Sequence, residues 1–352
     1  MMDALPEEIV RALGEESIGI EVTTRCNGAC GHCFARAGRD RDFDMDEATA
    51  VAIAREGAAT GYRHLHITGG EPLLWGPLFD LLDAAAEQDY ESVFVNTNGT
   101  LIDDAAAREL ESRRDLVTLS ISIQGPGELH DTVRGPGSHG AAVAGMERAL
   151  AAGVPVHVFT VVGRSLLPRL PRFAEELFGS HPGIRDLTLI QMIRVRGDAL
   201  DLSGEILSPE EFIAMVKMAS LLNLWGLRVA VLRNPLATAV SRALSIPWLA
   251  PSAPLHRGGG IMVMADGGIA CAHSTEERFG EYGPGALAAA LGSAAYREAV
   301  AVDDAACASC RHLALCRENG MLRPSERNRD MDESSPFCVR VLGAACREEE
   351  AR

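Results

Sequence analysis

Three cysteines lie within eight positions near the beginning of the sequence, at Cys26, Cys30 and Cys33. Thiolates at this spacing can bind zinc, contribute to a disulfide or hold an iron–sulfur cluster. Three thiolates on one short loop can hold three irons of a [4Fe–4S] cluster and leave the fourth iron open. The spacing alone leaves open a cluster, a zinc site that lacks one protein ligand, and cysteines that are only buried in the core.

A second group of cysteines, toward the other end of the sequence, contains Cys307, Cys310, Cys316 and Cys338. Four thiolates are enough for a closed metal site, and zinc is the more common occupant of such a site. No cysteine lies between positions 34 and 270. The sequence therefore predicts two metal-binding regions on either side of a middle segment without cysteine.

The composition describes a globular protein of 352 residues, 47% hydrophobic, with a net charge of −16. Nine cysteines without an export signal indicate metal or redox chemistry rather than disulfides. No basic stripe offers phosphate contacts, and no apolar run reaches the roughly 18 residues that span a bilayer. We therefore expect a cytoplasmic protein with neither a nucleic-acid nor a membrane partner.

The elements that must position these residues alternate along the middle of the chain. The predicted strands are 18–23, 64–68, 92–97, 117–123, 155–162 and 186–193, and the predicted helices are 46–61, 77–88, 103–114, 141–153 and 170–178. Strand–helix alternation predicts a parallel sheet with right-handed crossovers. The sequence therefore predicts an α/β fold, a partial (β/α)6 TIM-like barrel.

The pattern changes after position 197. Ser208 and Pro209 are expected to begin a helix that ends near Leu224, and a β-hairpin is expected from 261 onward. We predict the following division of the chain: an N-terminal extension at 1–16, the barrel at 17–233, an irregular connection at 234–260, and a small C-terminal cysteine-rich domain at 261–352.

Candidate binding residues follow the predicted strands. Cys26 comes directly after the first strand, at the carboxyl edge, where parallel sheets place their chemistry. Gly69-Gly70-Glu71-Pro72 follows the second strand; glycines let a backbone approach a ligand closely, and a carboxylate accepts hydrogen bonds from an ammonium group. Asn98 follows the third strand. Alone, both motifs are also typical of ordinary turns.

Two further positions could bind a polar ligand. Ser120 and Ser122 are two apart in the fourth strand and so lie on one face, although serines are also tolerated there as packing. Arg134 could bind a carboxylate with its planar guanidinium, and a structural salt bridge with Asp131 is the alternative.

Taken in chain order, these motifs resemble those of the radical SAM superfamily over roughly 17–195. The resemblance covers C-x3-C-x2-C, Gly-Gly-Glu-Pro, Asn-Thr-Asn-Gly and "HDTVRGPGS" at 130–138. It implies that S-adenosylmethionine (SAM) occupies the open iron through its amino and carboxylate groups. Reduction of the cluster would then cleave SAM to methionine and a 5′-deoxyadenosyl radical. The implied cofactor-binding residues are Phe34, Gly69, Gly70, Glu71, Pro72, Asn98, Ser120, Ser122 and Arg134.

The C-terminal cysteines are similar to those of the SPASM/Twitch branch of this superfamily. The resemblance implies an auxiliary [4Fe–4S] cluster on Cys307, Cys310, Cys316 and Cys338. The branch expects a further cysteine where this chain has Gly320, and no cysteine lies between Cys271 and Cys307. We therefore expect a single auxiliary site. The resemblance implies an iron–sulfur cluster there, and zinc is the alternative occupant.

Cys271 is left without an assigned role. It is either a small buried residue or a functional thiol near the mouth of the active site that donates a hydrogen atom to a substrate radical. Some members of the branch epimerise stereocentres in this way. Cys346 is expected to have no role.

The resemblance implies an oxidoreductase or epimerase in natural-product maturation, acting by epimerisation or two-electron oxidation. A flavodoxin or ferredoxin would supply the electron. Only 25 residues precede Cys26, so we expect no fused leader-peptide-recognition domain. The substrate could be a peptide or a small molecule such as a sugar or a tetrapyrrole. A non-catalytic zinc-binding scaffold on the same fold is the alternative from another class.

Overall fold

The computed structural model describes residues 16–192 apart from 34, 36 and 39–41; 202–249 apart from 233 and 247; and 259–271, 277–300, 314 and 337–350. The chain forms two compact units. The first unit comprises Met1–Ile123, His130–His157 and Arg257–Ala299, and the second comprises Gln124–Leu129, Val158–His256 and Val300–Arg352. Each unit is described by itself.

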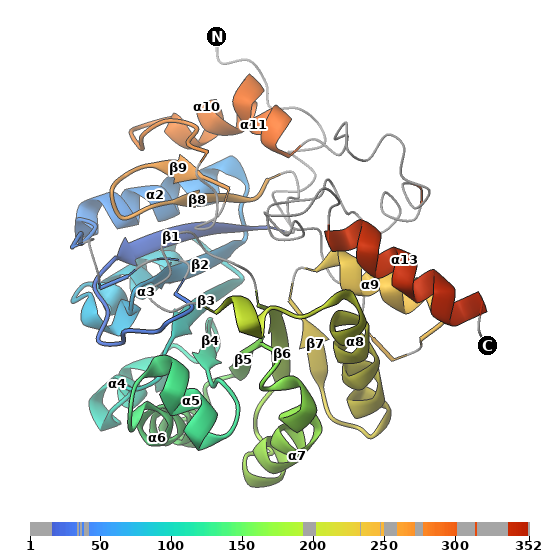
Figure 1. The fold of residues 1–352 in the computed structure, drawn as a ribbon. Helices are drawn as coiled ribbons and strands as arrows, with labels where there is room; N and C mark the ends of the chain where they lie inside the picture. The colour runs from blue at the N-terminus through green and yellow to red at the C-terminus, as the bar shows by residue number, and fades with distance from the viewer. Residues whose placement is uncertain are drawn as a thin grey trace. The chain divides into compact units, whose positions relative to one another are not determined.

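The first unit is built on a sheet with the strand order β4-β3-β2-β1-β8-β9, visible in Figure 1. Its strands are β1 (Ser17–Thr23), β2 (His64–Gly69), β3 (Ser92–Thr97), β4 (Val117–Ser122), β8 (Ile261–Val263) and β9 (Ile269–Ala270). All neighbouring pairs are parallel except β8 with β9. The four predicted strands of this unit are present within one residue of their expected ends.

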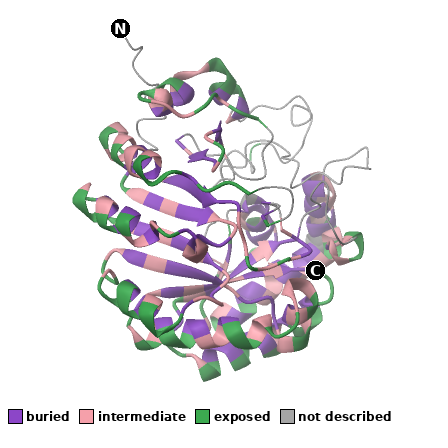
Figure 2. Ribbon diagram, turned by 90° about the vertical axis from the view of Figure 1, so that its left-hand side faces the viewer, coloured by how far each residue is buried: buried purple, intermediate pink, exposed green. Residues whose placement is uncertain are grey.

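The two faces of this sheet differ in composition, because successive side chains of a strand point to opposite faces. Leu65, Val93 and Val95 are at most 2% exposed. His66 and Phe94 alternate with them, are partly exposed and pair in register across β2 and β3. This alternation is visible as the banded strands of Figure 2. The sheet therefore keeps one accessible face that carries polar and aromatic side chains.

Two helices of the first unit begin at side-chain caps that the sequence provides. Asp46 accepts a hydrogen bond from Thr49 N at the start of α2, and Asp103 caps α4 through Ala105 N and Ala106 N. The helices of this unit are α2 (Glu47–Thr60), α3 (Leu78–Glu87), α4 (Asp104–Glu111), α6 (Ser138–Ala151), α10 (Ala286–Gly292) and α11 (Ala294–Ala299), with a 3-10 turn, η1, at Pro72–Leu74. A helix that the sequence pattern missed, α5 (Gly127–Arg134), crosses the boundary between the units.

The predicted hairpin at 261 onward is present, but it extends the barrel sheet instead of belonging to a separate C-terminal part. Ile261, Met262 and Val263 of β8 pair in parallel with Ile18, Gly19 and Ile20 of β1. A side chain at Gly19 would lie 2.7 Å from the Met262 side chain, so glycine at this position lets the two strands pack closely.

The strands of the second unit have the order β7-β6-β5. The boundary between the units falls within β5 (Val156–Val162). Its other strands and helices are β6 (Asp186–Gln191), β7 (Val229–Val231), α7 (Leu170–Ser180), α8 (Pro209–Leu224), α9 (Pro235–Ala243) and α13 (Phe337–Glu350), with 3-10 turns η2 at Leu167–Arg169 and η3 at Ser203–Glu205. Helix α8 has the predicted bounds, because Ser208 and Glu211 form a reciprocal capping box.

Two helices of the second unit correct the sequence prediction. The segment expected to be an irregular connection, 234–260, contains α9, which begins where the Asn234 side chain accepts a hydrogen bond from Ala237 N. The cysteine-rich tail ends in α13, which packs against α8 and α9. The rings of Phe212 and Phe337 meet edge to face at 5.9 Å between centroids. Tertiary packing, rather than local periodicity, supports both helices.

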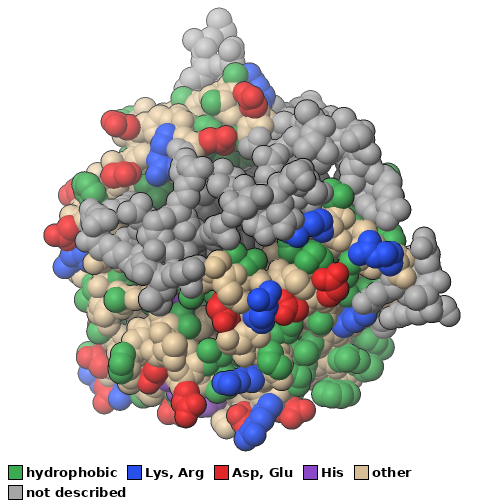
Figure 3. All heavy atoms as spheres, in the orientation of Figure 1, with side chains coloured by type: hydrophobic (Ala, Val, Ile, Leu, Met, Phe, Trp, Pro, Cys, Tyr) green, Lys and Arg blue, Asp and Glu red, His purple; other side chains and the backbone are tan. Residues whose placement is uncertain are grey.

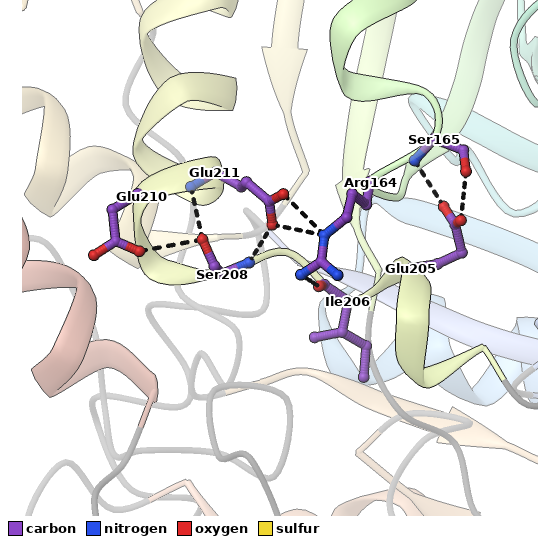
Figure 4. Close-up of polar contacts among 7 residues, drawn as sticks. All are labelled: Arg164, Ser165, Glu205, Ile206, Ser208, Glu210 and Glu211. Carbon is purple, nitrogen blue, oxygen red and sulfur yellow. Dashed lines mark hydrogen bonds and ion pairs between the residues drawn. The ribbon is translucent and has the colours of Figure 1, made fainter.

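A cluster of hydrogen bonds fixes the start of α8 to the turn after β5 (Figure 4). Arg164 Nε lies 2.8 Å from Glu211 Oε1, and Ser208 N donates to Glu211 Oε2 at 2.7 Å. Arg164 N also donates to Glu205 O, and Ser165 N donates to the Glu205 carboxylate at 2.9 Å. These bonds connect β5, η3 and α8 within the second unit.

The described surface is mixed in charge. On the face drawn in Figure 3, acidic and basic side chains of the described residues are interspersed. None of the helices in the described part of the chain is long and apolar enough to cross a membrane.

Candidate cofactor-binding site

The three-cysteine loop leaves β1 at the carboxyl edge of the sheet, as the sequence predicts. Cys26, Cys30 and Cys33 are partly exposed. Two of the sulfurs converge, since a Cβ built on Gly28 would lie 3.6 Å from both Cys26 Sγ and Cys30 Sγ. Burial raises the pKa of the Cys26 thiol to about 11. Binding of a metal as thiolate would therefore release a proton from Cys26.

The two glycines after β2 contact the base of this loop. Gly70 N donates to Thr23 O at 2.8 Å, and the following amide, Glu71 N, donates to Arg25 O at 2.9 Å. A Cβ on Gly69 would lie 2.3 Å from Thr23 O, and one on Gly70 would lie 2.1 Å from Arg25 O. The sequence prediction gave these glycines a close approach to a ligand. In the structure they allow a close approach between two backbone segments.

The Glu71 carboxylate is fully buried and accepts three hydrogen bonds. Oε1 accepts from Thr97 Oγ1 at 2.7 Å and from Leu73 N at 3.2 Å, and Oε2 accepts from Asn98 N at 2.7 Å. Burial raises the pKa of this carboxyl, and the three hydrogen bonds partly oppose that shift. Glu71 thus connects the end of β2 to the turn after β3, while Pro72 begins η1.

Buried polar atoms without a partner lie on β3 and β4 beyond this carboxylate. Ser120 is 1% exposed, and its hydroxyl has no hydrogen-bond partner in the part of the chain that the structure describes. Asn96 stands opposite Ser120 in the register, and its Oδ1 is also buried without a partner. Ser122 follows on the same face and is partly exposed. Asn96 was not among the predicted site residues, although a polar residue two positions before Asn98 was a usable signal.

The predicted arginine lies against the cysteine loop. Arg134 Nη1 is 3.9 Å from Cys30 Sγ, and its Nε is buried and has no hydrogen-bond partner within the described ranges. Near it the loop is fixed by a bond from Gly31 N to Val133 O at 3.1 Å. The Asp131 carboxylate instead accepts from Gly137 N and His139 N, both at 2.8 Å, so it caps α6.

His32 lies between Cys30 and Cys33 and is 9% exposed, and its buried Nδ1 has no partner among the described residues. Burial, together with the nearby Arg134 and His130, lowers the pKa of His32 to about 3. The imidazole is therefore neutral at physiological pH.

These residues fit SAM and a cluster. Within the described part of the chain, no three Cys, His, Asp or Glu side chains are grouped to hold one metal ion. A [4Fe–4S] cluster does not require three side chains around one metal ion, because each of its irons binds a separate thiolate. Among the described residues, four buried polar atoms on β3, β4, α5 and the loop have no hydrogen-bond partner, namely Asn96 Oδ1, Ser120 Oγ, Arg134 Nε and His32 Nδ1. Buried polar groups are normally paired, so these atoms favour a polar ligand at this edge.

The structure corrects the expected position of Cys271. It follows β9, which runs antiparallel to β8, and Ala270 pairs with Met262 at the level of Gly19. The chain therefore reaches Cys271 at the amino edge of the parallel strands. About 17 Å of β1 separates the level of Ile18 from that of Thr23, which precedes the cysteine loop. Cys271 also contributes to the raised pKa of the buried Tyr296. This placement argues against a hydrogen donor at the site.

Several predicted residues cannot be placed. Phe34, Cys307, Cys310 and Cys316 lie outside the described residues. Cys338 is described: it is 6% exposed and lies in the first turn of α13. The auxiliary cluster stays a prediction.

Two proteins with assigned names are similar in sequence to this chain. The probable GTP 3′,8-cyclase of Methanopyrus kandleri is 31% identical over 212 residues, which cover 56% of this chain and 66% of the cyclase, just under two-thirds of its length. The mycofactocin maturase MftC of Mycolicibacterium smegmatis is 26% identical over 358 residues, covering 94% of this chain and 84% of the maturase.

A solved structure and a family model extend the comparison. Native anSMEcpe with bound AdoMet and the Cp18Cys peptide has a TM-score of 0.71 and covers 94% of this chain and 96% of that chain at 19% identity. That likeness confirms the predicted α/β fold with its parallel sheet. The model of the Radical SAM superfamily matches residues 20–169, which include the cysteine loop, Glu71 and Arg134. Residues 20–169 of this chain are therefore similar to the radical SAM superfamily.

Proposed function

We propose that this protein is a radical SAM enzyme that matures a natural product by epimerisation or two-electron oxidation. Cys26, Cys30 and Cys33 would hold the SAM-binding [4Fe–4S] cluster. When bound, the cluster and SAM supply the 5′-deoxyadenosyl radical that abstracts a substrate hydrogen. The observation that carries the proposal is the set of buried polar atoms without partners beside the three-cysteine loop.

The chain's own residues would bind and orient the cofactor. Arg134 would meet the SAM carboxylate, and Ser120, Ser122 and Asn98 would contact its polar groups. Phe34 would pack against it. The amino group of SAM would be bound by the segment Gly69-Gly70-Glu71-Pro72. The partner-free Arg134 Nε and Ser120 Oγ support these roles.

A peptide is the favoured substrate class. Both the mycofactocin maturase and the solved structure with a bound Cp18Cys peptide point to peptide chemistry in similar proteins. The similarity to a probable GTP 3′,8-cyclase keeps a small-molecule substrate as the second candidate. A flavodoxin or ferredoxin would donate the electron.

Anaerobic reconstitution tests the proposal. We expect about eight irons per chain if the auxiliary cluster forms on Cys307, Cys310, Cys316 and Cys338. We also expect 5′-deoxyadenosine when dithionite and SAM are added. The variant with Cys26, Cys30 and Cys33 changed to alanine should keep about four irons and form no 5′-deoxyadenosine. Zinc in place of iron, with no SAM cleavage, would support the scaffold alternative instead.

A further inference from the structure

Asn27 lies between the first two cysteines of the loop, and its side chain bonds to the turn after β3. Asn27 Oδ1 accepts from Asn98 Nδ2 at 2.8 Å, and Asn27 Nδ2 donates to Thr100 Oγ1 at 2.8 Å. Both ends of the Asn27 amide therefore bond to residues of that turn, which lie 71 and 73 positions farther along the chain.

The partners of Asn27 are fixed by further bonds. Asn98 Oδ1 accepts from Thr100 N at 2.9 Å and from Thr100 Oγ1 at 2.6 Å. Because its oxygen is occupied by Thr100, the Asn98 amide presents its nitrogen to Asn27. The three side chains form a closed ring of directed hydrogen bonds, so the position of Asn27 follows from that of the turn.

A second path joins the same two segments on the other side of Cys26. Glu71 N donates to Arg25 O at 2.9 Å, and Asn98 N donates to Glu71 Oε2 at 2.7 Å. Residue 25 is thus bonded to Glu71, residue 27 to Asn98, and Glu71 to Asn98. Cys26 lies inside a closed circuit of hydrogen bonds that includes the Gly-Gly-Glu segment.

We propose that Asn27 is a positioning residue that couples the placement of Cys26 to the SAM-binding segment. This inference rests on the proposed function, since it assigns the loop to a SAM-binding cluster. Asn27 has no contact with the cofactor in this role. It acts by fixing the first cysteine relative to Glu71 and Asn98, so that cluster and SAM-binding groups keep one geometry.

The test compares Asn27→Ala with the matched control Asn223→Ala. Asn223 also uses both ends of its amide, bonding Val229 O and Val229 N at 2.8 Å, but it belongs to the second unit. SAM is added to the protein with its cluster reduced, and the electron paramagnetic resonance spectrum is recorded. The measured quantity is the SAM concentration at which half of the spectral change has occurred. We expect Asn27→Ala to keep its iron and to need about ten-fold more SAM, as loss of two hydrogen bonds implies. Asn223→Ala should respond as the unchanged protein does.

Thr100→Val supplies a second variant, because it removes the hydroxyl that Asn27 contacts while keeping the side-chain shape. If Asn27 acts through the ring, Asn27→Ala combined with Thr100→Val should weaken the SAM response no more than Asn27→Ala alone. The inference would be overturned if the two substitutions weakened the SAM response additively. It would also be overturned if Asn27→Ala left the SAM response unchanged or lost its iron. If the unchanged protein itself binds no iron or shows no SAM response, the proposed function fails instead.

Discussion

At the scale of single residues, the site depends on positions where the backbone of one segment approaches that of another. Gly70 is the clearest case, because its backbone amide bonds to Thr23 and the next amide bonds to Arg25. Any side chain there would collide with Arg25 O. The glycine pair therefore sets the distance between the Gly-Gly-Glu segment and the cysteine loop.

Gly70→Ala should destabilise the protein by about 1–3 kcal/mol and reduce its iron content, since a Cβ 2.1 Å from Arg25 O forces the segments apart. Gly76→Ala is the matched control, because nothing lies within 4 Å of a Cβ there, and it should change the free energy of unfolding by less than about 0.5 kcal/mol. Urea denaturation and iron analysis measure both effects. Equal results for the two variants would contradict the assigned role of Gly70.

A buried histidine near the site predicts a pH dependence of stability. Burial, then Arg134 and His139, lower the pKa of His130 from its ordinary 6.5 to about 3, while Asp131 opposes the shift. Below pH 6.5 the unfolded chain binds a proton that the folded chain does not, so stability falls as the pH falls from 6.5 toward 3.

His130→Gln should reduce this dependence. Between pH 7.5 and 5.5, the unchanged protein should lose about 1 kcal/mol more of its free energy of unfolding than the variant loses. Urea denaturation at the two pH values gives the difference. An equal loss in both proteins would show that His130 is protonated in the folded state.

At the scale of elements, α8 shows how a helix boundary can be fixed by sequence. Ser208 and Glu211 satisfy each other's backbone amides, and Arg164 adds an ion pair from the turn after β5 (Figure 4). Burial alone would raise the pKa of Glu211, but the hydrogen bonds from Arg164 and Ser208 lower it overall. The contribution of this carboxylate is therefore present above its unfolded pKa and is lost at acid pH.

Ser208→Ala should lower the free energy of unfolding by about 1 kcal/mol, because the amide of Glu211 loses its cap. Ser208→Asn keeps a capping oxygen and should stay close to the unchanged protein. Thermal or urea denaturation distinguishes the two. A loss of equal size in Ser208→Asn would indicate that packing, and not the cap, is responsible.

At the scale of the whole molecule, the chain divides differently from its sequence pattern. The hairpin of β8 and β9 joins the sheet of the first unit, although it follows α9 of the second unit in the sequence. This pairing with β1 places Cys271 at the amino edge of the strands, opposite to the cysteine loop.

Cys271→Ala should therefore keep product formation within about two-fold, because about 17 Å of strand lies between its level and that of the loop. Cys30→Ala is the contrasting variant and should abolish SAM cleavage. Product analysis with a peptide that the unchanged protein converts, and measurement of 5′-deoxyadenosine, test both. Loss of product in Cys271→Ala, with SAM cleavage retained, would restore the hydrogen-donor role.

Much of the first unit could be predicted from the sequence. Period-two alternation and β-branched residues identified β1 to β4 within one residue, and the capping residues Ser208 and Glu211 identified the start of α8. These signals are local, since each depends on a few neighbouring side chains. Helices α9 and α13 were missed because they are supported by packing against α8.

By itself, the sequence determined the cysteine spacing, the order of the motifs along the strands and the resemblance to the radical SAM superfamily. Local spacing is sufficient for this, because parallel strands bring their carboxyl ends to one edge. Only the tertiary structure decided that Gly70 packs against Arg25 O, that Asn27 bonds to Asn98, and that Cys271 lies at the opposite edge. Those outcomes depend on strand register and on contacts between residues far apart in the chain, which no local pattern encodes.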